Sequence, residues 1–225
     1  MPTSYIFCPS KFLNKEKINI PENINDENVV SSSGALFIAA DSGIETALKF
    51  NIKPNILIGD FDSSSVDLID YDIKDTKIIK YPAEKDDTDS MLAVKYSLEN
   101  GYKNIVIIGG LDGRIDHTLV NLFYLKYIHK HGGYGSITNG YNKISYLSGS
   151  DLPVKIYKYY KYVSVISVSP EISGVTLKGF RYNLSNAKVK FEEPYTVCNE
   201  ISNDFKYGEV KILNGEALIC ECDDM

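Results

Sequence analysis

The stretch Ile56-Leu57-Ile58-Gly59-Asp60-Phe61-Asp62-Ser63 sets out the organisation of this chain, because a short apolar run leads straight into two carboxylates. In an extended segment, residues i and i+2 point to the same side, so Asp60 and Asp62 would converge on one point. Two like charges held together repel unless a cation neutralises them. Oxygen-only ligands favour a hard ion such as Mg²⁺, so the stretch predicts a metal site at the end of a strand.

Two further acidic segments follow apolar runs in the same way. Lys85-Asp86-Asp87-Thr88-Asp89 comes after the strand-like Lys77–Lys80. Gly109-Gly110-Leu111-Asp112-Gly113-Arg114-Ile115-Asp116-His117 comes after the apolar run Asn104–Ile108. In an open parallel sheet, ligands bind at the carboxyl ends of the strands. The three segments together therefore predict a ligand site at one edge of such a sheet.

Composition narrows the class of protein. With 225 residues, the chain can form one large domain or two small ones. A formal net charge of -6 argues against a nucleic-acid-binding surface, and no apolar run is long enough to span a membrane. The spacing of Cys8, Cys198, Cys220 and Cys222 does not fit structural zinc, and reduced, buried thiols indicate a cytoplasmic protein. The N-terminus lacks the pattern of a signal peptide.

Strand-like and helix-like segments alternate up to about Gly140, which predicts right-handed crossovers and a mostly parallel sheet. Helices are expected at Asp89–Asn100 and Asp116–His131, each followed by a glycine. The second has an apolar stripe at helical spacing, formed by Leu119, Val120, Phe123, Tyr127 and Ile128. The expected strands are Tyr5–Cys8, Ala35–Ala40, Ile56–Gly59, Lys77–Tyr81, Ile105–Gly109 and Gly135–Thr138.

Helical periodicity disappears beyond Gly140, and short strand-like pieces follow one another. Among them, Thr196–Ile201 is predicted as a strand, and Asn214-Gly215 predicts a two-residue hairpin between the last two strands. The predicted fold class is α/β: a three-layer α/β/α domain with a mostly parallel sheet at residues 1–140, followed by an all-β sandwich at residues 141–225.

The ordered motifs resemble those of the thiamin pyrophosphokinase family, over nearly the whole chain. The resemblance is carried by Ala39-Ala40-Asp41-Ser42-Gly43, Pro54, Gly59–Ser63, Lys85–Asp89, Gly109–His117, Gly174–Tyr182 and Cys198-Asn199-Glu200. It implies a thiamin diphosphokinase, which transfers diphosphate from ATP to the hydroxyl of thiamin and releases AMP. It also implies a homodimer, with thiamin bound between the α/β domain of one subunit and the sandwich of the other.

The motifs and the resemblance together assign site residues. Asp60, Asp62 and Asp89 are the expected ligands of Mg²⁺, and Arg114 and Asp116 join them as catalytic residues, since diphosphoryl transfer depends on positioning and electrostatics. The expected ATP-binding residues are Asp41, Gly43, Lys85, Asp86, Thr88, Gly109, Gly110, Gly113, Arg114 and His117. Cys198 and Asn199 are expected to bind thiamin, although the family usually has serine where Cys198 stands.

Several of these residues also have a plain structural interpretation. Thr88 and its neighbours could cap a helix, and Arg114 could form a surface ion pair with Asp112 or Asp116. The glycines could belong to an ordinary strand–helix turn, Asp41 could cap a helix, and His117 could be a hydrogen-bonded structural residue. Asn199 could make a strand-end or bulge hydrogen bond.

Two other functions fit the same features. One is another Mg²⁺-dependent phosphotransferase or nucleotide hydrolase, since a fold does not determine function. The other is a catalytically silent sensor that binds nucleotide or thiamin. Loss of Asp60, Asp62 or Asp89 would favour the sensor, but all three are present.

Overall fold

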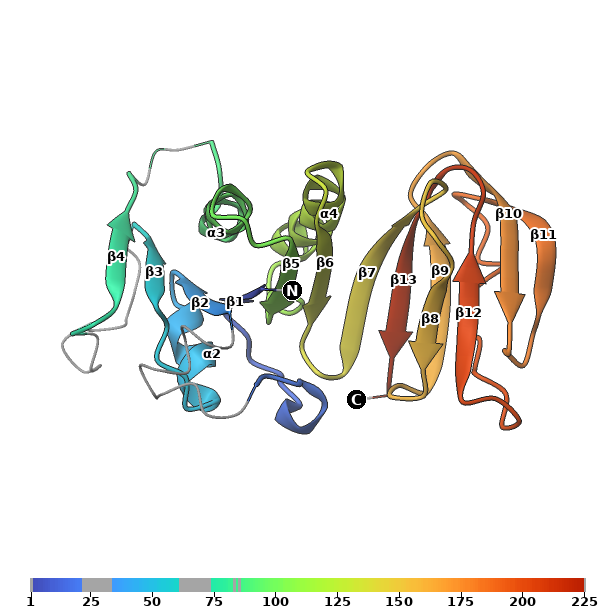
Figure 1. The fold of residues 1–225 in the computed structure, drawn as a ribbon, viewed down its shortest axis with the longest axis horizontal. Helices are drawn as coiled ribbons and strands as arrows, with labels where there is room; N and C mark the ends of the chain where they lie inside the picture. Colours follow the sequence, from blue (N-terminus) through green and yellow to red (C-terminus); the bar gives the residue numbers. More distant parts are fainter. Residues whose placement is uncertain (1, 22–33, 61–73, 83, 85, 225) are drawn as a thin grey trace. The chain divides into compact units, whose positions relative to one another are not determined.

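The computed structural model describes residues 2–21, 34–60, 74–82, 84 and 86–224, and the chain divides into two units (Figure 1). Unit 1 is Met1–Gly140 and unit 2 is Tyr141–Met225. The predicted fold class is confirmed, since a parallel sheet with helices precedes an antiparallel β structure. The predicted ligand Asp62 and the predicted ATP-binding residue Lys85 lie outside the described residues.

The described part of unit 1 has strands in the order β4-β3-β2-β1-β5-β6, and every pairing among them is parallel. The strands are β1 (Thr3–Phe7), β2 (Ala35–Ala40), β3 (Ile56–Gly59), β4 (Lys77–Lys80), β5 (Asn104–Ile108) and β6 (Tyr134–Thr138). The helices of the described part are η1 (Lys15–Lys17), α2 (Gly43–Lys49), α3 (Asp89–Glu99) and α4 (Ile115–Lys130).

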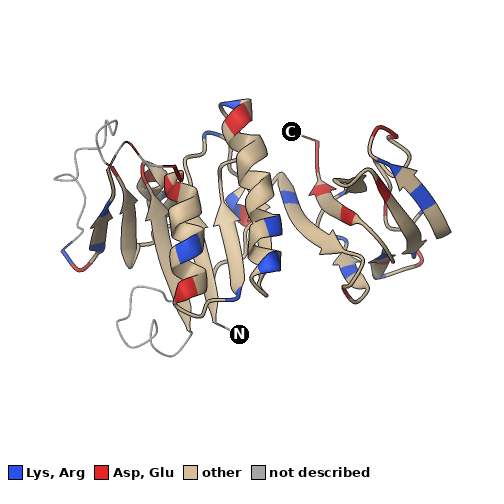
Figure 2. Ribbon diagram, turned by 90° about the horizontal axis from the view of Figure 1, so that it is seen from above, with Lys and Arg blue, Asp and Glu red and all other residues tan. Residues whose placement is uncertain are grey.

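Helices cover both faces of this sheet, as the alternation of side chains along β1 shows. Tyr5 and Phe7 pack in the same apolar cluster as Ala47 of α2. Ser4 and Cys8, at the alternate positions on either side of this pair, instead hydrogen-bond to side chains of α3. Because successive side chains of a strand point to opposite faces, α2 and α3 lie on opposite sides of the sheet. Figure 2 shows α3 and α4 side by side on one face.

A buried hydroxyl pair joins β1 to α3. Ser97 donates to the Ala93 carbonyl within α3 at 2.8 Å, so its one proton is used there. Ser4 therefore donates to Ser97, with 2.8 Å between the two oxygens, and both side chains are fully buried. Polar atoms buried in this way cost little because each has a partner.

The buried face of α4 differs from the predicted stripe. Leu119, Val120 and Phe123 are 48%, 39% and 63% exposed. The helix instead buries Asn121, Tyr124, Leu125 and Ile128, which recur at helical spacing. The polar Asn121 is accepted inside because its amide donates to the Gly110 carbonyl at 2.9 Å. Of the predicted stripe only Ile128 is among the buried residues, so the buried face is turned away from the one predicted.

Unit 2 is formed by two antiparallel sheets. One has the order β7-β13-β9 and the other β11-β10-β12-β8. The strands are β7 (Asn142–Ser148), β8 (Val154–Tyr157), β9 (Tyr162–Ser167), β10 (Glu171–Lys178), β11 (Leu184–Lys190), β12 (Tyr207–Lys211) and β13 (Glu216–Cys222). One apolar cluster takes residues from both sheets, including Val165 and Ile219 from the first and Val175 and Val210 from the second. A shared core between two sheets defines a sandwich.

Asn214-Gly215 does not form the predicted hairpin. The strand before it, β12, pairs with β10 and β8, while the strand after it, β13, pairs with β7 and β9. Asn214 pairs with Ser173, and Gly215, at φ +89, accepts a hydrogen bond from the Gly149 N–H at 3.0 Å. The dipeptide therefore carries the chain from one sheet to the other, where glycine is still needed for the positive φ.

The predicted strand Thr196–Ile201 is also absent. Cys198 has φ +58, in the left-handed region, which interrupts an extended backbone. What remains are two isolated bridges, Val163 with Asn199 and Phe180 with Ile201.

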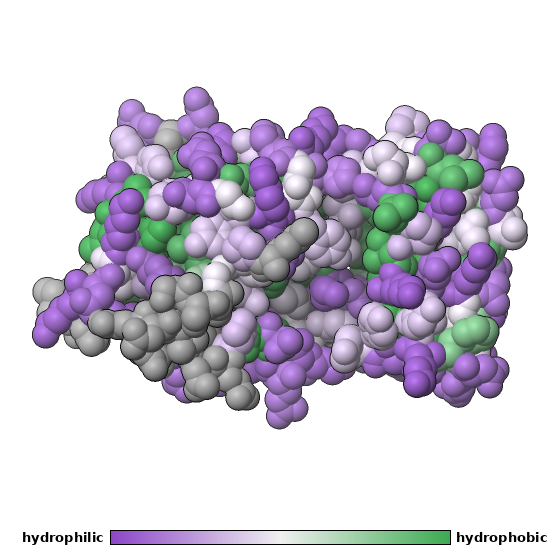
Figure 3. All heavy atoms as spheres, viewed as in Figure 1, coloured by the Kyte–Doolittle hydropathy of each residue, from purple (hydrophilic) through white to green (hydrophobic). Residues whose placement is uncertain are grey.

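On the face drawn in Figure 3, hydrophilic side chains predominate and apolar ones form separate patches. Among the described helices, none is long and apolar enough to cross a membrane.

Candidate functional site

The carboxyl ends of the central strands of unit 1 meet at one edge of its sheet. Phe7 at the end of β1 pairs with Ala39 of β2 and Ile108 of β5, and Ala40 pairs with Ile58 of β3. The segments that begin at Cys8, Asp41, Asp60 and Gly109 therefore leave the sheet together. This is the edge at which the three acidic segments were predicted to meet.

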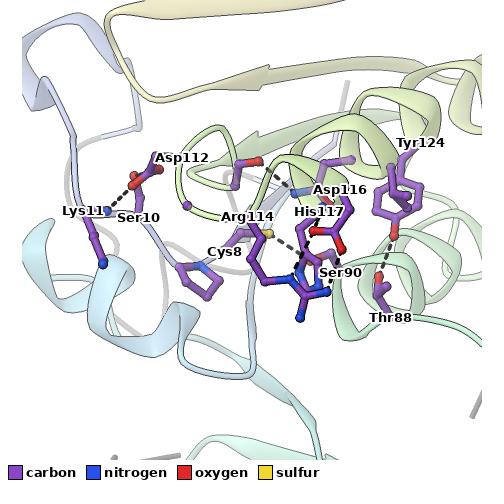
Figure 4. A pocket seen from close by; sticks show the side chains of 15 residues that line it. Cys8, Ser10, Lys11, Thr88, Ser90, Asp112, Arg114, Asp116, His117 and Tyr124 are labelled. Atoms are coloured by element: carbon purple, nitrogen blue, oxygen red, sulfur yellow. Dashed lines mark hydrogen bonds and ion pairs between the residues drawn. The ribbon is translucent and has the colours of Figure 1, made fainter.

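A pocket of about 470 Å³ opens at this edge (Figure 4). Its walls come from the segment after β1, the start of α3, the β5–α4 turn and the first turns of α4. The lining residues are Cys8, Pro9, Ser10, Lys11, Thr88, Ser90, Gly110, Asp112, Gly113, Arg114, Asp116, His117, Val120, Asn121 and Tyr124.

The β5–α4 turn depends on glycines at two positions. Gly109 has φ +89, and a Cβ there would lie 2.4 Å from the Cys8 carbonyl oxygen. Gly110 has φ +70, its N–H donates to the Pro9 carbonyl at 3.1 Å, and a Cβ there would lie 2.7 Å from the Asn121 amide nitrogen. Both sites thus require a residue without a side chain. Gly109 itself does not line the pocket, whereas Gly110 does.

Arg114 and Asp116 form an exposed, two-pronged ion pair on the pocket wall. The distances are 3.1 Å from Arg114 Nε to Asp116 Oδ1 and 2.6 Å from Nη2 to Oδ2. The hydrogen bond from Arg114 lowers the pKa of Asp116, and the same bond raises the pKa of Arg114. Asp116 also accepts from the His117 backbone N–H at 2.9 Å. The pair holds the guanidinium in one orientation at the start of α4, so Asp116 positions Arg114.

The start of α3 is tied to α4 by a hydroxyl contact. Thr88 caps α3, since its Oγ1 accepts from the Met91 N–H at 3.2 Å. The same oxygen lies 2.5 Å from the Tyr124 hydroxyl. Burial raises the pKa of Tyr124, so this phenol remains protonated at neutral pH. The helix-capping interpretation of Thr88 is therefore confirmed, and the residue also lines the pocket.

Cys8 forms the buried wall of the pocket. Its sulfur lies 3.3 Å from the Ser90 hydroxyl, and the side chain is 1% exposed. Burial raises the pKa of the Cys8 thiol to about 11, with a smaller contribution from the charge of Asp89. A thiol that stays protonated at neutral pH is a poor nucleophile. Cys8 therefore packs in the pocket wall and is not a reactive group.

Asp41 and Gly43 follow β2 but do not line the pocket. Asp41 has φ +49, and its N–H donates to the Ile58 carbonyl at 2.8 Å. Its Oδ1 is buried and, among the described residues, has no hydrogen-bond partner. Gly43 starts α2, where a Cβ would lie 2.0 Å from the Phe7 carbonyl oxygen. The glycine therefore allows the start of α2 to pack closely against the end of β1.

The predicted metal ligands are only partly described. Asp60 directly follows β3, and Asp89 is the first residue of α3. Neither residue lines the pocket, and Asp86 is likewise outside it, exposed to solvent. Within the described residues, no three His, Cys, Asp or Glu side chains come together to hold a metal ion.

Unit 2 has its own pocket, of about 370 Å³. Its lining residues are Leu177, Tyr182, Asn183, Leu184, Tyr195, Thr196, Val197 and Asn199. The Asn199 side chain, 5% exposed, serves the backbone around it: Oδ1 accepts from the N–H groups of Tyr182 and Glu200 at 3.1 and 3.0 Å, and Nδ2 donates to the Tyr182 carbonyl at 2.7 Å. Cys198 is exposed but does not line this pocket.

Sequence reasoning missed nine of the fifteen residues that line the first pocket. The missed residues are Cys8, Pro9, Ser10, Lys11, Ser90, Asp112, Val120, Asn121 and Tyr124. The first four directly follow β1, so the rule that ligands gather at carboxyl ends would have found them once β1 was placed centrally. Asn121 and Tyr124 sit on a helix face, where the sequence carries no such signal.

The fold and the two pockets define a protein with a nucleotide-type α/β unit followed by a β-sandwich. The chain matches the family model "Thiamin pyrophosphokinase, catalytic domain" over residues 28–133. It matches "Thiamin pyrophosphokinase, vitamin B1 binding domain" over residues 151–215.

Relatives and solved structures agree with these matches. A thiamine pyrophosphokinase of Bacillus subtilis is 30% identical over 183 residues, which is 80% of this chain and 86% of the relative. Thiamin pyrophosphokinase 1 of Caenorhabditis elegans is 27% identical over 176 residues, 73% of this chain and 71% of the relative. A crystal structure of thiamine pyrophosphokinase from Bacillus subtilis has a TM-score of 0.79 at 26% identity, covering 99% of this chain and 100% of that one. The chain belongs to the thiamin pyrophosphokinase family of diphosphotransferase enzymes.

Proposed function

We propose that this enzyme transfers diphosphate from Mg-ATP to the hydroxyl of thiamin, giving thiamin diphosphate and AMP. The observation that carries the proposal is the pocket at the carboxyl edge of unit 1. It combines a glycine turn, a helix start and a positioned guanidinium, all features that bind phosphate groups. Family membership names the acceptor, thiamin.

In this proposal, the β5–α4 turn and Arg114 bind the phosphates of ATP. The backbone around Gly110 and Gly113 can approach the nucleotide closely because neither residue has a side chain. Arg114, held by Asp116, presents its planar fork to phosphate oxygens as charge develops on them. Positioning and electrostatics of this kind supply most of the catalysis in phosphoryl transfer.

The residues at the sheet edge fit a hard divalent cation. Asp60 and Asp89 offer oxygen donors, and the buried Oδ1 of Asp41 at the same edge has no hydrogen-bond partner among the described residues. We assign Asp60, Asp62 and Asp89 as the ligands of Mg²⁺. The ion, when bound, neutralises charge on the phosphates of ATP.

We further propose that unit 2 binds thiamin and that the enzyme is a homodimer with shared sites. The unit 2 pocket has exposed aromatic side chains, Tyr182 and Tyr195, which suit the flat rings of thiamin. On unit 1, exposed Leu119, Val120 and Phe123 form an apolar stripe on α4, and Val120 also lines the first pocket. An apolar surface that borders a site fits coverage by a second subunit. The free thiols fit a cytoplasmic location.

The reaction can be tested with purified protein, Mg-ATP and thiamin. We expect AMP and thiamin diphosphate in equal amounts. ADP with thiamin monophosphate would instead identify a monophosphate kinase, and ATP consumption without thiamin would identify a hydrolase. If neither substrate is converted but both bind in calorimetry, the protein is a sensor and the proposal fails.

The shared site can be tested by mixing two defective variants. Asp60→Asn would disable the unit 1 site, and Tyr195→Ala would alter the unit 2 pocket without touching its backbone hydrogen bonds. If each site draws on two subunits, re-equilibrated heterodimers contain one intact site and activity partly returns. Absence of recovery, with subunit exchange shown by mass spectrometry, would place each site within one chain.

A further inference from the structure

The segment after β1 is clamped to the β5–α4 turn by one carboxylate. Asp112 Oδ1 accepts from the Ser10 hydroxyl at 2.7 Å. Asp112 Oδ2 accepts from the backbone N–H of Lys11 at 2.5 Å and from that of Phe12 at 3.4 Å. A further bond, from Lys49 Nζ to the Ser10 carbonyl at 2.9 Å, ties the segment to α2. The backbone at Lys11 is therefore held from two sides.

Among the described residues, this arrangement leaves one cation of the pocket, Lys11, without an ion-pair partner. Two strongly basic side chains line it, Lys11 and Arg114, and Figure 4 shows them on different elements. Arg114 is already paired with Asp116. The charge of Asp112 is directed at the N–H and O–H donors of residues 10–12. Among the described residues, the Lys11 ammonium has no ion-pair partner, and the hydrogen bond from Lys11 to Asp112 is made by its backbone N–H.

We propose that Lys11 binds a phosphate group of ATP in this pocket and that Asp112 is its positioning residue. The inference rests on the proposed function and adds a phosphate-binding residue to it. A lysine on a free loop loses much conformational entropy when it binds a ligand. Here the backbone is fixed beforehand by Asp112, so less of that cost remains. The carboxylate thus places a cation beside the glycine turn although it is itself negative.

The first test removes the charge of Lys11 and measures binding without catalysis. In Lys11→Met, we expect the Kd for a non-hydrolysable ATP analogue to rise about tenfold or more, as for a charge-assisted hydrogen bond, with the Kd for adenosine unchanged. Lys11→Arg should retain most of the affinity. Lys130→Met, at the far end of α4 and outside the pocket, is the matched control.

Two outcomes would overturn the role of Lys11. One is an unchanged Kd for the ATP analogue in Lys11→Met. The other is an equal loss of adenosine binding, which would show damage to the pocket wall. If the wild-type protein itself binds no ATP analogue, the proposed function fails and not this assignment alone.

The second test asks whether Asp112 acts through Lys11. Asp112→Asn keeps the shape but loses the charge and one acceptor edge, so binding of the ATP analogue should weaken several-fold in the wild-type background. In the Lys11→Met background it should change little, because the group it positions is gone. Equal weakening in both backgrounds, or tighter binding in Asp112→Asn, would show that Asp112 does not position Lys11.

Discussion

The pockets of the two units differ in how many polar side chains they leave exposed to a ligand. In unit 1, Arg114 and Asp116 bond mainly to each other, and the Lys11 ammonium has no ion-pair partner among the described residues, so these charged groups stay at the pocket surface. In unit 2, the amide of Asn199 is buried and spends three hydrogen bonds on backbone groups of Tyr182 and Glu200. The first pocket displays charged groups and uses others, such as Asn121 and Asp112, to hold its wall, whereas the side-chain bonds of Asn199 in the second pocket all go to the wall.

The difference follows from the secondary structure beneath each pocket. Parallel strands in unit 1 end together, and the turns after them are closed by backbone bonds such as Gly109 N–H to the Thr138 carbonyl at 2.8 Å. In unit 2, residues 179–183 and 196–201 are mostly outside strands, and their N–H groups need other acceptors. A polar residue beside a pocket is therefore free for ligands only where the backbone does not claim it.

The largest effect should come from the predicted metal site. Asp60→Asn keeps the size of the side chain but removes a charged oxygen donor, so we expect turnover to fall about 10²–10³-fold. Formation of AMP and thiamin diphosphate at saturating Mg²⁺ measures this, with the thermal midpoint as the control for folding. Turnover close to that of the wild type would remove Asp60 from the site.

A smaller loss is expected at the ion pair. Arg114→Lys keeps the charge but loses the fork that bonds twice to Asp116, so kcat/KM should fall roughly tenfold or more. The effect should be on activity and not on the thermal midpoint, because both side chains are exposed. Full activity with lysine at this position would show that the Arg114–Asp116 pair is a surface ion pair with no role in catalysis.

Asn199 should show the reverse pattern, a loss of stability. Asn199→Ala leaves the two N–H groups and the carbonyl without their partner, at a cost of about 1–3 kcal/mol. The thermal midpoint should fall by about 2–4 °C for each kcal/mol. Asn199→Asp keeps the acceptor for both N–H groups and should be milder. An unchanged midpoint with lost thiamin binding would make Asn199 a ligand and erase the contrast between the pockets.

The smallest effect compares two glycines of one turn. Gly110 and Gly113 both have positive φ, at +70 and +94, so alanine at either costs about 1–2 kcal/mol of backbone strain. Only at Gly110 would the new Cβ also meet a neighbour, Asn121. Gly110→Ala should therefore lower the midpoint more than Gly113→Ala. Equal shifts in thermal denaturation would show that Asn121 moves aside freely.

The sequence predicted the fold of unit 1 well because its signals are local. Ala35–Ala40 and Ile56–Gly59 have the predicted bounds, and α3 and α4 begin within one residue of expectation. The predicted site residues Thr88, Gly110, Gly113, Arg114, Asp116 and His117 do line one pocket. Their roles toward substrates stay predictions.

What the sequence could not supply was set by tertiary partners. The turn at Asn214-Gly215 has hairpin composition, but strand pairing across two sheets decides its direction. Asp112 and Asp116 are aspartates of the same glycine-containing segment, yet Asp112 bonds to a segment about 100 positions earlier in the chain. No local pattern distinguishes these cases, because the deciding contacts join distant parts of the chain.

The hydroxyl pair of Ser4 and Ser97 has a consequence for how uniquely α3 is seated. Apolar side chains alone would allow a helix to slide along a sheet by a turn, about 5.4 Å, with little change in buried area. Such a shift would separate the two oxygens, which are 2.8 Å apart, and leave the Ser4 hydroxyl buried without an acceptor. The shifted arrangement is thus penalised far more than the native one is stabilised. Because α3 has only one favourable position on the sheet, Thr88 and Asp89 at its start are also held in one position.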